Sequence, residues 1–150
     1  MRLASLVVAG LLVPPGAAHA VLPPFAYLEA RASAEVHLQV RVTRVRLAPR
    51  DNACRIEGRA LSVWRGSLKA GETIRFRLPC RFPSTPVMPG PVLWFDPGAL
   101  RAGQVLEGFF DTGEAGLRPA RDQVFIFGTA SDTPRCGTTD YPCREESPAP

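Results

Sequence analysis

Arginine side chains that alternate with apolar residues are the most prominent chemical feature of this chain. Residues 41–81 hold ten arginines and one lysine against three acids, whereas residues 82–150 carry five arginines against nine acids. Arg41, Arg55, Arg75 and Arg77 each lie between apolar neighbours, which is typical of the exposed face of strands. Guanidinium groups bind carboxylates and phosphates bidentately. The pattern therefore predicts a face for an anionic partner: a carboxylated polysaccharide, a phosphate-bearing envelope lipid or an acidic protein surface.

A second interpretation of the arginines needs no partner. Arginine makes up 17 of the 18 basic residues, and a compositional bias toward Arg, Ala, Gly and Pro can arise without selection on function. Basic strands can also pair with acidic strands in the same sheet, where each exposed ion pair contributes roughly 0–1 kcal/mol. Convergence of the arginines on one face would favour recognition, and scatter would favour composition.

Carboxylates are the remaining candidates for catalysis. Two such groups at a suitable distance would allow glycoside hydrolysis, and the candidates are Asp96, Glu107, Asp111 and Asp122. Their spacing selects no pair. Glu107 shares its strand face with Val105 and Phe109, so we expect it to be buried and to contact an arginine, because an unpaired buried charge is costly.

Histidine and cysteine chemistry is not expected. His37 lies on the polar side of an alternating stretch and is predicted to face solvent, which leaves no histidine base for a nucleophile. Residues 66–71 lack the glycine density and the Gly-Lys-Ser/Thr ending of a phosphate-binding loop. Trp64 and Phe76 fall on predicted core faces and so are not expected to stack on bases. We therefore expect no enzyme, no cofactor, no metal and no nucleic-acid partner.

Four cysteines, Cys54, Cys80, Cys136 and Cys143, allow three disulfide connectivities. We favour Cys54 with Cys80 and Cys136 with Cys143, because each pair brackets a segment that can fold back on itself. A zinc site is the alternative, but the chain has no Cys-x-x-Cys motif. The first pair would join two neighbouring strands.

Residues 1–20 have the pattern of an export signal peptide. Arg2 supplies the positive charge, residues 3–13 form a largely apolar run, and Ala18-His19-Ala20 is a small-x-small cleavage site. We expect a mature chain that begins at Val21 and is secreted or periplasmic. The apolar run is shorter than the roughly 20 residues of a membrane-spanning helix, so no transmembrane segment is expected in the mature chain.

The remaining elements position these residues in one domain, residues 21–130, followed by a flexible tail, residues 131–150. A short helix is predicted over 25–34 and strands over 36–47, 54–64, 73–80, 92–95, 105–110 and 123–127. The alternation changes phase after Val42, which indicates a β-bulge. Asp96-Pro97 has the composition of a helix start. Short strands with little helix predict an all-β fold, a small OB-like antiparallel barrel.

The motif C-x-I-x-G-x-A-L-x-V-W-R-G-x-L-x-x-G-x-x-I-x-F begins at Cys54, ends at Phe76 and is followed by Cys80. It resembles netrin-like modules, which include the inhibitory domain of tissue inhibitors of metalloproteinases. The resemblance covers residues 54–80 and implies an OB barrel and a binding role. Those inhibitors coordinate their target's zinc through a cysteine at the mature N-terminus, where this chain has Val21, so that mode of inhibition is not expected.

The sequence therefore predicts an exported binding module that recognises an anionic partner through Arg41, Arg55, Arg75 and Arg77. Two alternatives remain open. An inhibitor of a secreted enzyme would insert the proline-rich loop at residues 81–90 into a target cleft. A carboxylate-dependent hydrolase would bring two of the four candidate acids into one pocket.

Overall fold

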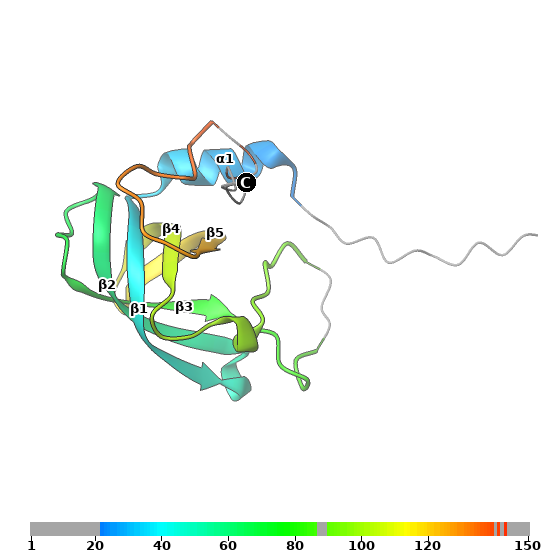
Figure 1. Ribbon diagram of the computed structural model, residues 1–150. Coiled ribbons are helices and arrows are strands. Elements are labelled where there is room, and N and C mark those ends of the chain that lie inside the picture. Colours follow the sequence, from blue (N-terminus) through cyan, green and yellow to red (C-terminus); the bar gives the residue numbers. More distant parts are fainter. Residues whose placement is uncertain (1–21, 87–89, 140, 142, 144–150) are drawn as a thin grey trace, which may run out of the picture.

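Five strands close into a small barrel with one short helix beside it (Figure 1). The computed structural model describes residues 22–86, 90–139, 141 and 143, so the expected signal peptide lies outside the described residues. The elements are α1 (Pro24–Ser33), β1 (Val36–Ala48), β2 (Ala53–Arg65), β3 (Thr73–Pro79), β4 (Val105–Gly113) and β5 (Gly116–Phe127), with 3-10 turns η1 (Pro49–Asp51) and η2 (Pro97–Ala99).

The strand order around the barrel is β1-β2-β3-β5-β4. Neighbouring strands run antiparallel, except that β3 and β5 meet in parallel at Phe76 and Leu117. The all-β class is confirmed, and the closed five-strand barrel is consistent with the OB-like architecture.

β1 has one buried face, because every second residue in its first half is apolar and packs in the barrel core. Val36, Leu38, Val40 and Val42 are each at most 2% exposed and line the barrel core. The register with β2 shifts between Val42 and Arg44, which confirms the predicted bulge. A bulge bends a strand, and this bend lets β1 pair with β4 along its first half and continue along β2.

β2 and β3 form the predicted disulfide-linked hairpin. Cys54 and Cys80 are bonded, with 5.7 Å between their Cα atoms. Register shifts in the first half of β1 place Val63 rather than Trp64 against the core. The expectation that Trp64 is a core residue is therefore wrong, whereas Phe76, at 4% exposed, does lie in the core.

The connection from β3 to β4 is mostly loop. The strand predicted over 92–95 is not formed: within the described chain, Phe95 makes only an isolated bridge to Cys80. Val92, Leu93 and Trp94 are more than one-third exposed, so the apolar run that predicted the strand lies at the surface. The predicted helix start at Asp96 is present, because its carboxylate accepts a hydrogen bond from the Gly98 N–H, but only the 3-10 turn η2 follows.

β4 and β5 are longer than predicted and meet in a tight turn between Gly113 and Gly116. A Cβ atom at Gly116 would lie 2.7 Å from the Arg75 carbonyl oxygen, so glycine allows this turn to approach β3. Arg121 and Asp122 are left-handed, with φ of 49° and 57°. This irregularity interrupts the alternation in β5, so the sequence pattern predicts only the last part of the strand.

α1 packs beside β5, and the chain after β5 covers the outer face of β1 and β4. The outward-facing Phe109 packs in a second apolar cluster with Ala34, Ala120 and the disulfide between Cys136 and Cys143. We expected residues 131–150 to be a flexible tail. Their described part is instead packed on the barrel, since Cys136 is fully buried, while residues 144–150 lie outside the described residues.

Candidate functional site

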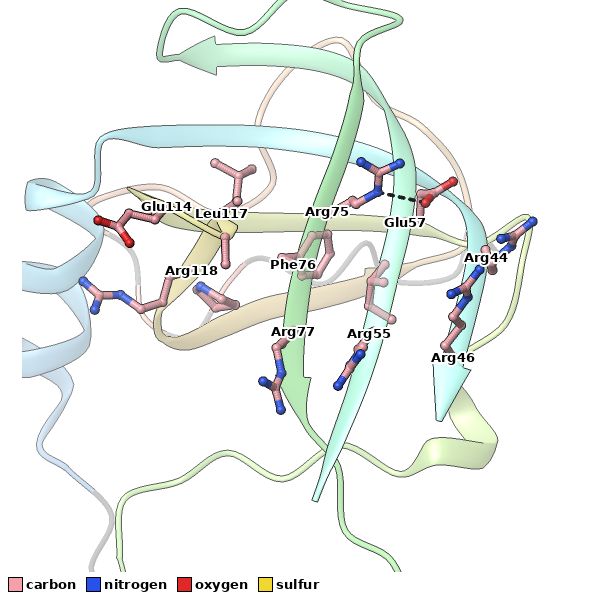
Figure 2. A pocket seen from close by; sticks show the side chains of 15 residues that line it. Arg44, Arg46, Arg55, Glu57, Arg75, Phe76, Arg77, Glu114, Leu117 and Arg118 are labelled. Carbon is pink, nitrogen blue, oxygen red and sulfur yellow. Dashed lines mark hydrogen bonds and ion pairs between the residues drawn. The ribbon is translucent and has the colours of Figure 1, made fainter. Parts of the chain in front are cut away.

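An open groove on one flank of the barrel brings six arginines together (Figure 2). Its volume is about 920 Å³, and it lies over β2, β3 and the turn between β4 and β5. We call it the arginine groove; its arginines are Arg44, Arg46, Arg55, Arg75, Arg77 and Arg118. The acidic residues Glu57 and Glu114 and the apolar residues Ile56, Phe76, Leu117 and Pro119 also line it.

Three of these arginines are aligned across neighbouring strands. Arg46 of β1 lies opposite Arg55 of β2, which lies opposite Arg77 of β3. Because adjacent strands are about 4.8 Å apart, this arginine row spans roughly 10 Å. Like charges directly opposite one another destabilise a sheet. Stability of the sheet therefore does not explain the arginine row.

Carboxylates already bind several groove arginines. Asp51 Oδ2 in η1 accepts a hydrogen bond from Arg55 Nη2 at 2.9 Å and one from Arg77 Nη2 at 3.5 Å. Arg75 Nε donates to Glu57 Oε2 at 3.0 Å, and this hydrogen bond is the main reason that the pKa of Glu57 is lowered. The guanidinium groups thus point toward carboxylates in the free protein.

Arg44 and Arg46 are different, because neither forms an ion pair within the described part of the chain. Both are exposed on β1. Their positive charge contributes to lowering the pKa of Glu57 on the neighbouring strand. They give the groove guanidinium groups that are available to an incoming anion.

The structure brings together Arg55, Arg75 and Arg77 of the four predicted arginines. Arg41 is not among the residues that line the groove; it lies opposite Arg59 and Val105 in its two ladders. The bulge after Val42 changes which side chains of β1 face this flank. The phase change in the sequence was the signal for Arg44 and Arg46, whereas nothing local in the sequence indicated Arg118.

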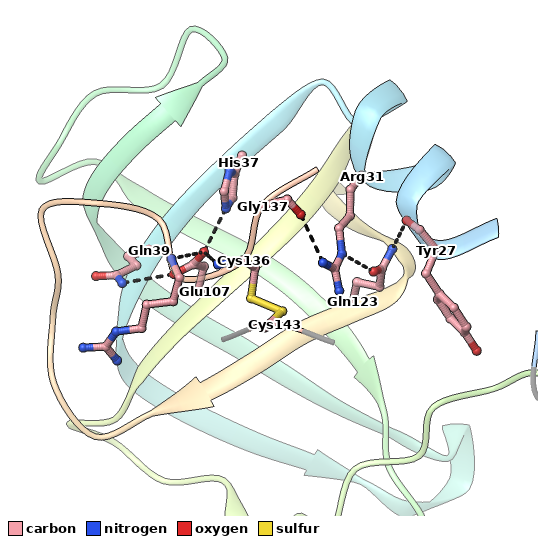
Figure 3. The surroundings of a disulfide bond; sticks show 10 residues. Tyr27, Arg31, His37, Gln39, Glu107, Gln123, Cys136, Gly137 and Cys143 are labelled. Atoms are coloured by element: carbon pink, nitrogen blue, oxygen red, sulfur yellow. Dashed lines mark hydrogen bonds and ion pairs between the residues drawn. A yellow bond between two sulfur atoms is a disulfide. The ribbon is translucent and has the colours of Figure 1, made fainter. Parts of the chain in front are cut away.

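A second polar cluster lies on the outer face of β1 and β4 (Figure 3). Glu107 is fully buried there, and His37 Nε2 lies 3.0 Å from its Oε1 atom. Gln39 donates to the other oxygen at 3.2 Å. The backbone N–H groups of Arg135 and Cys136 donate to the same carboxylate at 2.9–3.2 Å.

Two expectations about this cluster are wrong. His37 does not face solvent but is 6% exposed, because its ring packs against Trp64 and Phe109 and lies within hydrogen-bond distance of Glu107. Glu107 is buried as predicted, but it contacts the backbone of Arg135 rather than an arginine side chain. The covering segment is remote in sequence, so strand alternation alone could not reveal it.

Burial and hydrogen bonding act in opposite directions on the pKa of Glu107. Burial raises the pKa. Hydrogen bonds from His37, from the backbone of Cys136 and Arg135 and from Gln39 lower it, and together they outweigh burial. The net pKa lies below the ordinary value of 4.5. Glu107 is therefore an ionised anchor for the covering segment rather than a proton donor.

The other candidate acids have separate partners. Asp96 caps η2 at 2.9 Å from the Gly98 nitrogen, and Asp111 pairs with Arg118 at 3.7 Å. Burial raises the pKa of Asp122, although a hydrogen bond from the Leu93 backbone opposes this. None of the four candidate acids, all in the described chain, lines the arginine groove.

The described residues contain no candidate metal site and no free thiol. Among them, no group of three His, Cys, Asp or Glu side chains is placed to hold a metal ion. Both predicted disulfides are present and leave no free cysteine in the described chain. Within the same residues, no helix has the length and apolar character needed to cross a bilayer.

Fold and site together define a small all-β barrel of OB-like architecture with an arginine-lined groove. No protein-family model, curated protein or solved structure matches the chain. The resemblance of residues 54–80 to netrin-like modules therefore stays a prediction.

Proposed function

We propose that this protein is an exported binding module that holds an acidic polysaccharide in the arginine groove. The observation that carries the proposal is the arginine row, Arg46, Arg55 and Arg77, whose like charges the sheet does not need. Guanidinium groups are well suited to bind carboxylates. Export is supported by the signal-like pattern of residues 1–20 and by two disulfides, which are typical of oxidising compartments.

The position of the groove on the barrel supports a binding role. OB barrels bind oligosaccharides and oligonucleotides on the face of strands 2 and 3, between the loops that join strands 1 to 2 and 4 to 5. The arginine groove lies over β2 and β3, reaches the β4–β5 turn, and has Asp51 of the β1–β2 connection at its side. The analogy with OB barrels supports only the location of the site. The class of ligand is inferred from the residues that line the groove.

The lining favours a sugar chain over a membrane or a nucleic acid. A volume of about 920 Å³ is in the range of pockets that hold a ligand of several rings. The arginines line a hollow, which a flat lipid surface would contact only at its rim. Base binding uses exposed aromatic rings, but Phe76 in the groove is 4% exposed. Half-buried Leu117 and Pro119 offer apolar surface to the C–H faces of sugar rings.

A retention experiment tests the proposal with the double variant Arg44→Gln/Arg46→Gln. These two arginines form no ion pairs in the described chain, so their loss breaks no ion pair of the barrel. We expect binding to a linear polyuronate to weaken about tenfold, at roughly 0.7 kcal/mol for each exposed charge contact. The salt dependence of binding should become shallower in the same variant.

The matched control is Arg41→Gln/Arg101→Gln, which removes the same charge outside the groove and should change affinity less than twofold. Anionic vesicles and polyglutamate serve as competing ligands. Equal retention of the groove variant and the wild type at every salt concentration would refute the proposal. Tighter binding to vesicles or to polyglutamate than to polyuronate would refute the ligand class.

A further inference from the structure

Asp51 places a carboxylate directly on the arginine row of the free protein. One of its oxygens, Oδ2, contacts both Arg55 Nη2 at 2.9 Å and Arg77 Nη2 at 3.5 Å, and so bridges β2 and β3. The three side chains are 43–58% exposed. Exposed ion pairs of this kind are weak and exchange readily with other anions.

The backbone next to Asp51 is fixed by hydrogen bonds, whereas the Asp51 side chain is held only by exposed ion pairs. Asn52, in the left-handed conformation with φ of 49°, follows η1 and accepts a hydrogen bond from Cys80 N–H at 2.9 Å. The Asn52 side chain also accepts one from the Thr85 hydroxyl at 2.8 Å. Rotation of the Asp51 side chain is therefore sufficient to free the arginine row, without movement of the barrel.

We propose that Asp51 is a resident competitor for the ligand, an inference that rests on the proposed function. In the free protein its carboxylate occupies the position that one acidic group of the polysaccharide takes on Arg55 and Arg77. On binding, the ligand carboxylate replaces it, the Asp51 side chain turns to solvent, and Arg46 supplies the third guanidinium of the row.

This arrangement selects for a polymer over a single small anion. A monomeric anion competes with Asp51 at one position, and Asp51 has the advantage of being tethered there. A polyanion also contacts Arg44 and Arg46, which no described carboxylate occupies, and so gains binding energy that Asp51 cannot match. Asp51 also neutralises part of the like-charge repulsion in the unbound row.

The decisive variant is Asp51→Asn, which keeps the shape of the side chain and removes its charge. We expect it to bind linear polyuronate about three- to tenfold more tightly than the wild type, as the loss of two exposed ion pairs implies. The affinity for monomeric galacturonate should rise by at least the same factor. Asp51→Ser is a second variant and should behave in the same way.

A control separates competition from a change in net charge. Glu29→Gln on α1 changes the net charge equally, away from the groove; Glu29 is exposed. This variant should bind polyuronate within twofold of the wild type.

An NMR titration of the wild type gives an independent measurement. Saturation with polyuronate should shift the guanidinium signals of Arg55 and Arg77 together with the carboxylate ¹³C signal of Asp51. An unchanged Asp51 signal on saturation would overturn the inference even if the Asp51 variants did not fold.

The outcomes distinguish this inference from the proposed function. If the wild type binds polyuronate and Arg44→Gln/Arg46→Gln weakens it, but Asp51→Asn equals Glu29→Gln, Asp51 is not a competitor and the proposed function stands. If no variant binds polyuronate, both proposals fail.

Discussion

At the scale of single residues, the Glu107 carboxylate fastens the chain after β5 to the barrel. Both of its oxygens accept hydrogen bonds from the backbone of Arg135, and one also accepts from Cys136. Backbone donors require an acceptor in the interior, and an ionised carboxylate is the strongest that a side chain offers. The same carboxylate orders His37 and Gln39 on β1.

We expect Glu107→Gln to lower the free energy of unfolding by about 1–3 kcal/mol at pH 7, because the new amide N–H₂ group faces hydrogen-bond donors. The folded-state pKa of Glu107 is lowered, so its ionised form stabilises the protein above the unfolded-state pKa. This stabilisation is lost as the pH falls through the folded-state pKa. The difference between the wild type and the variant in urea unfolding should therefore begin to shrink as the pH falls below about 4.5, the ordinary value. A difference that stays constant down to pH 3 would contradict this role.

At the scale of elements, the approach of β1 to β2 depends on a glycine. Gly58 lies opposite Val42 in one ladder and opposite Ile74 in the other. A Cβ atom there would lie 2.6 Å from the Arg41 carbonyl oxygen and 2.5 Å from Val40 Cγ2. The backbone oxygen cannot move aside without disturbing the bulge that places Arg44 and Arg46 in the groove.

We expect Gly58→Ala to destabilise the protein by roughly 1–3 kcal/mol through overpacking. Gly128→Ala is the matched control, since a Cβ atom at Gly128 would meet nothing within 4 Å; its effect should stay within about 0.5 kcal/mol. Chemical denaturation measures both. Equal stability of the two variants would show that the strands can separate at Gly58 without loss.

At the scale of the whole molecule, two disulfides stabilise different parts. Cys54–Cys80 joins residues 26 apart and ties β2 to the end of β3. Cys136–Cys143 joins residues 7 apart and closes the segment that covers Glu107. The first closes the longer loop in the unfolded chain, so it restricts that chain more.

Removal of each disulfide by paired alanine substitution should reflect this difference. We expect Cys54→Ala/Cys80→Ala to lower the free energy of unfolding by roughly 3–4 kcal/mol and Cys136→Ala/Cys143→Ala by about 2 kcal/mol. Equilibrium urea unfolding of both double variants gives the comparison. A larger loss for the second pair would mean that the covering segment, rather than the hairpin, dominates the stability of the barrel.

Local sequence patterns predicted most of the barrel because strand alternation and turn composition act over a few residues. Val36, Leu38, Val40 and Val42 had to face one side of a strand in any fold. The strand predicted from the hydrophobic run at 92–95 does not form, because in the described chain this run pairs with a neighbour only through the isolated bridge between Phe95 and Cys80. The prediction that His37 faces solvent failed because a local pattern carries no information about remote contacts such as those with Phe109 and Glu107.

The amino-acid sequence by itself determined the all-β class, the bulge after Val42 and the excess of arginine between residues 41 and 81, whereas it only favoured the disulfide pairing that the structure shows. Closure of the barrel alone decided which arginines meet: it aligned Arg46, Arg55 and Arg77, brought Arg118 into the same groove and left Arg41 outside it. The physical reason is register. Spacing along a strand is set by neighbouring residues, whereas the partner across the sheet is set by the packing of the whole core.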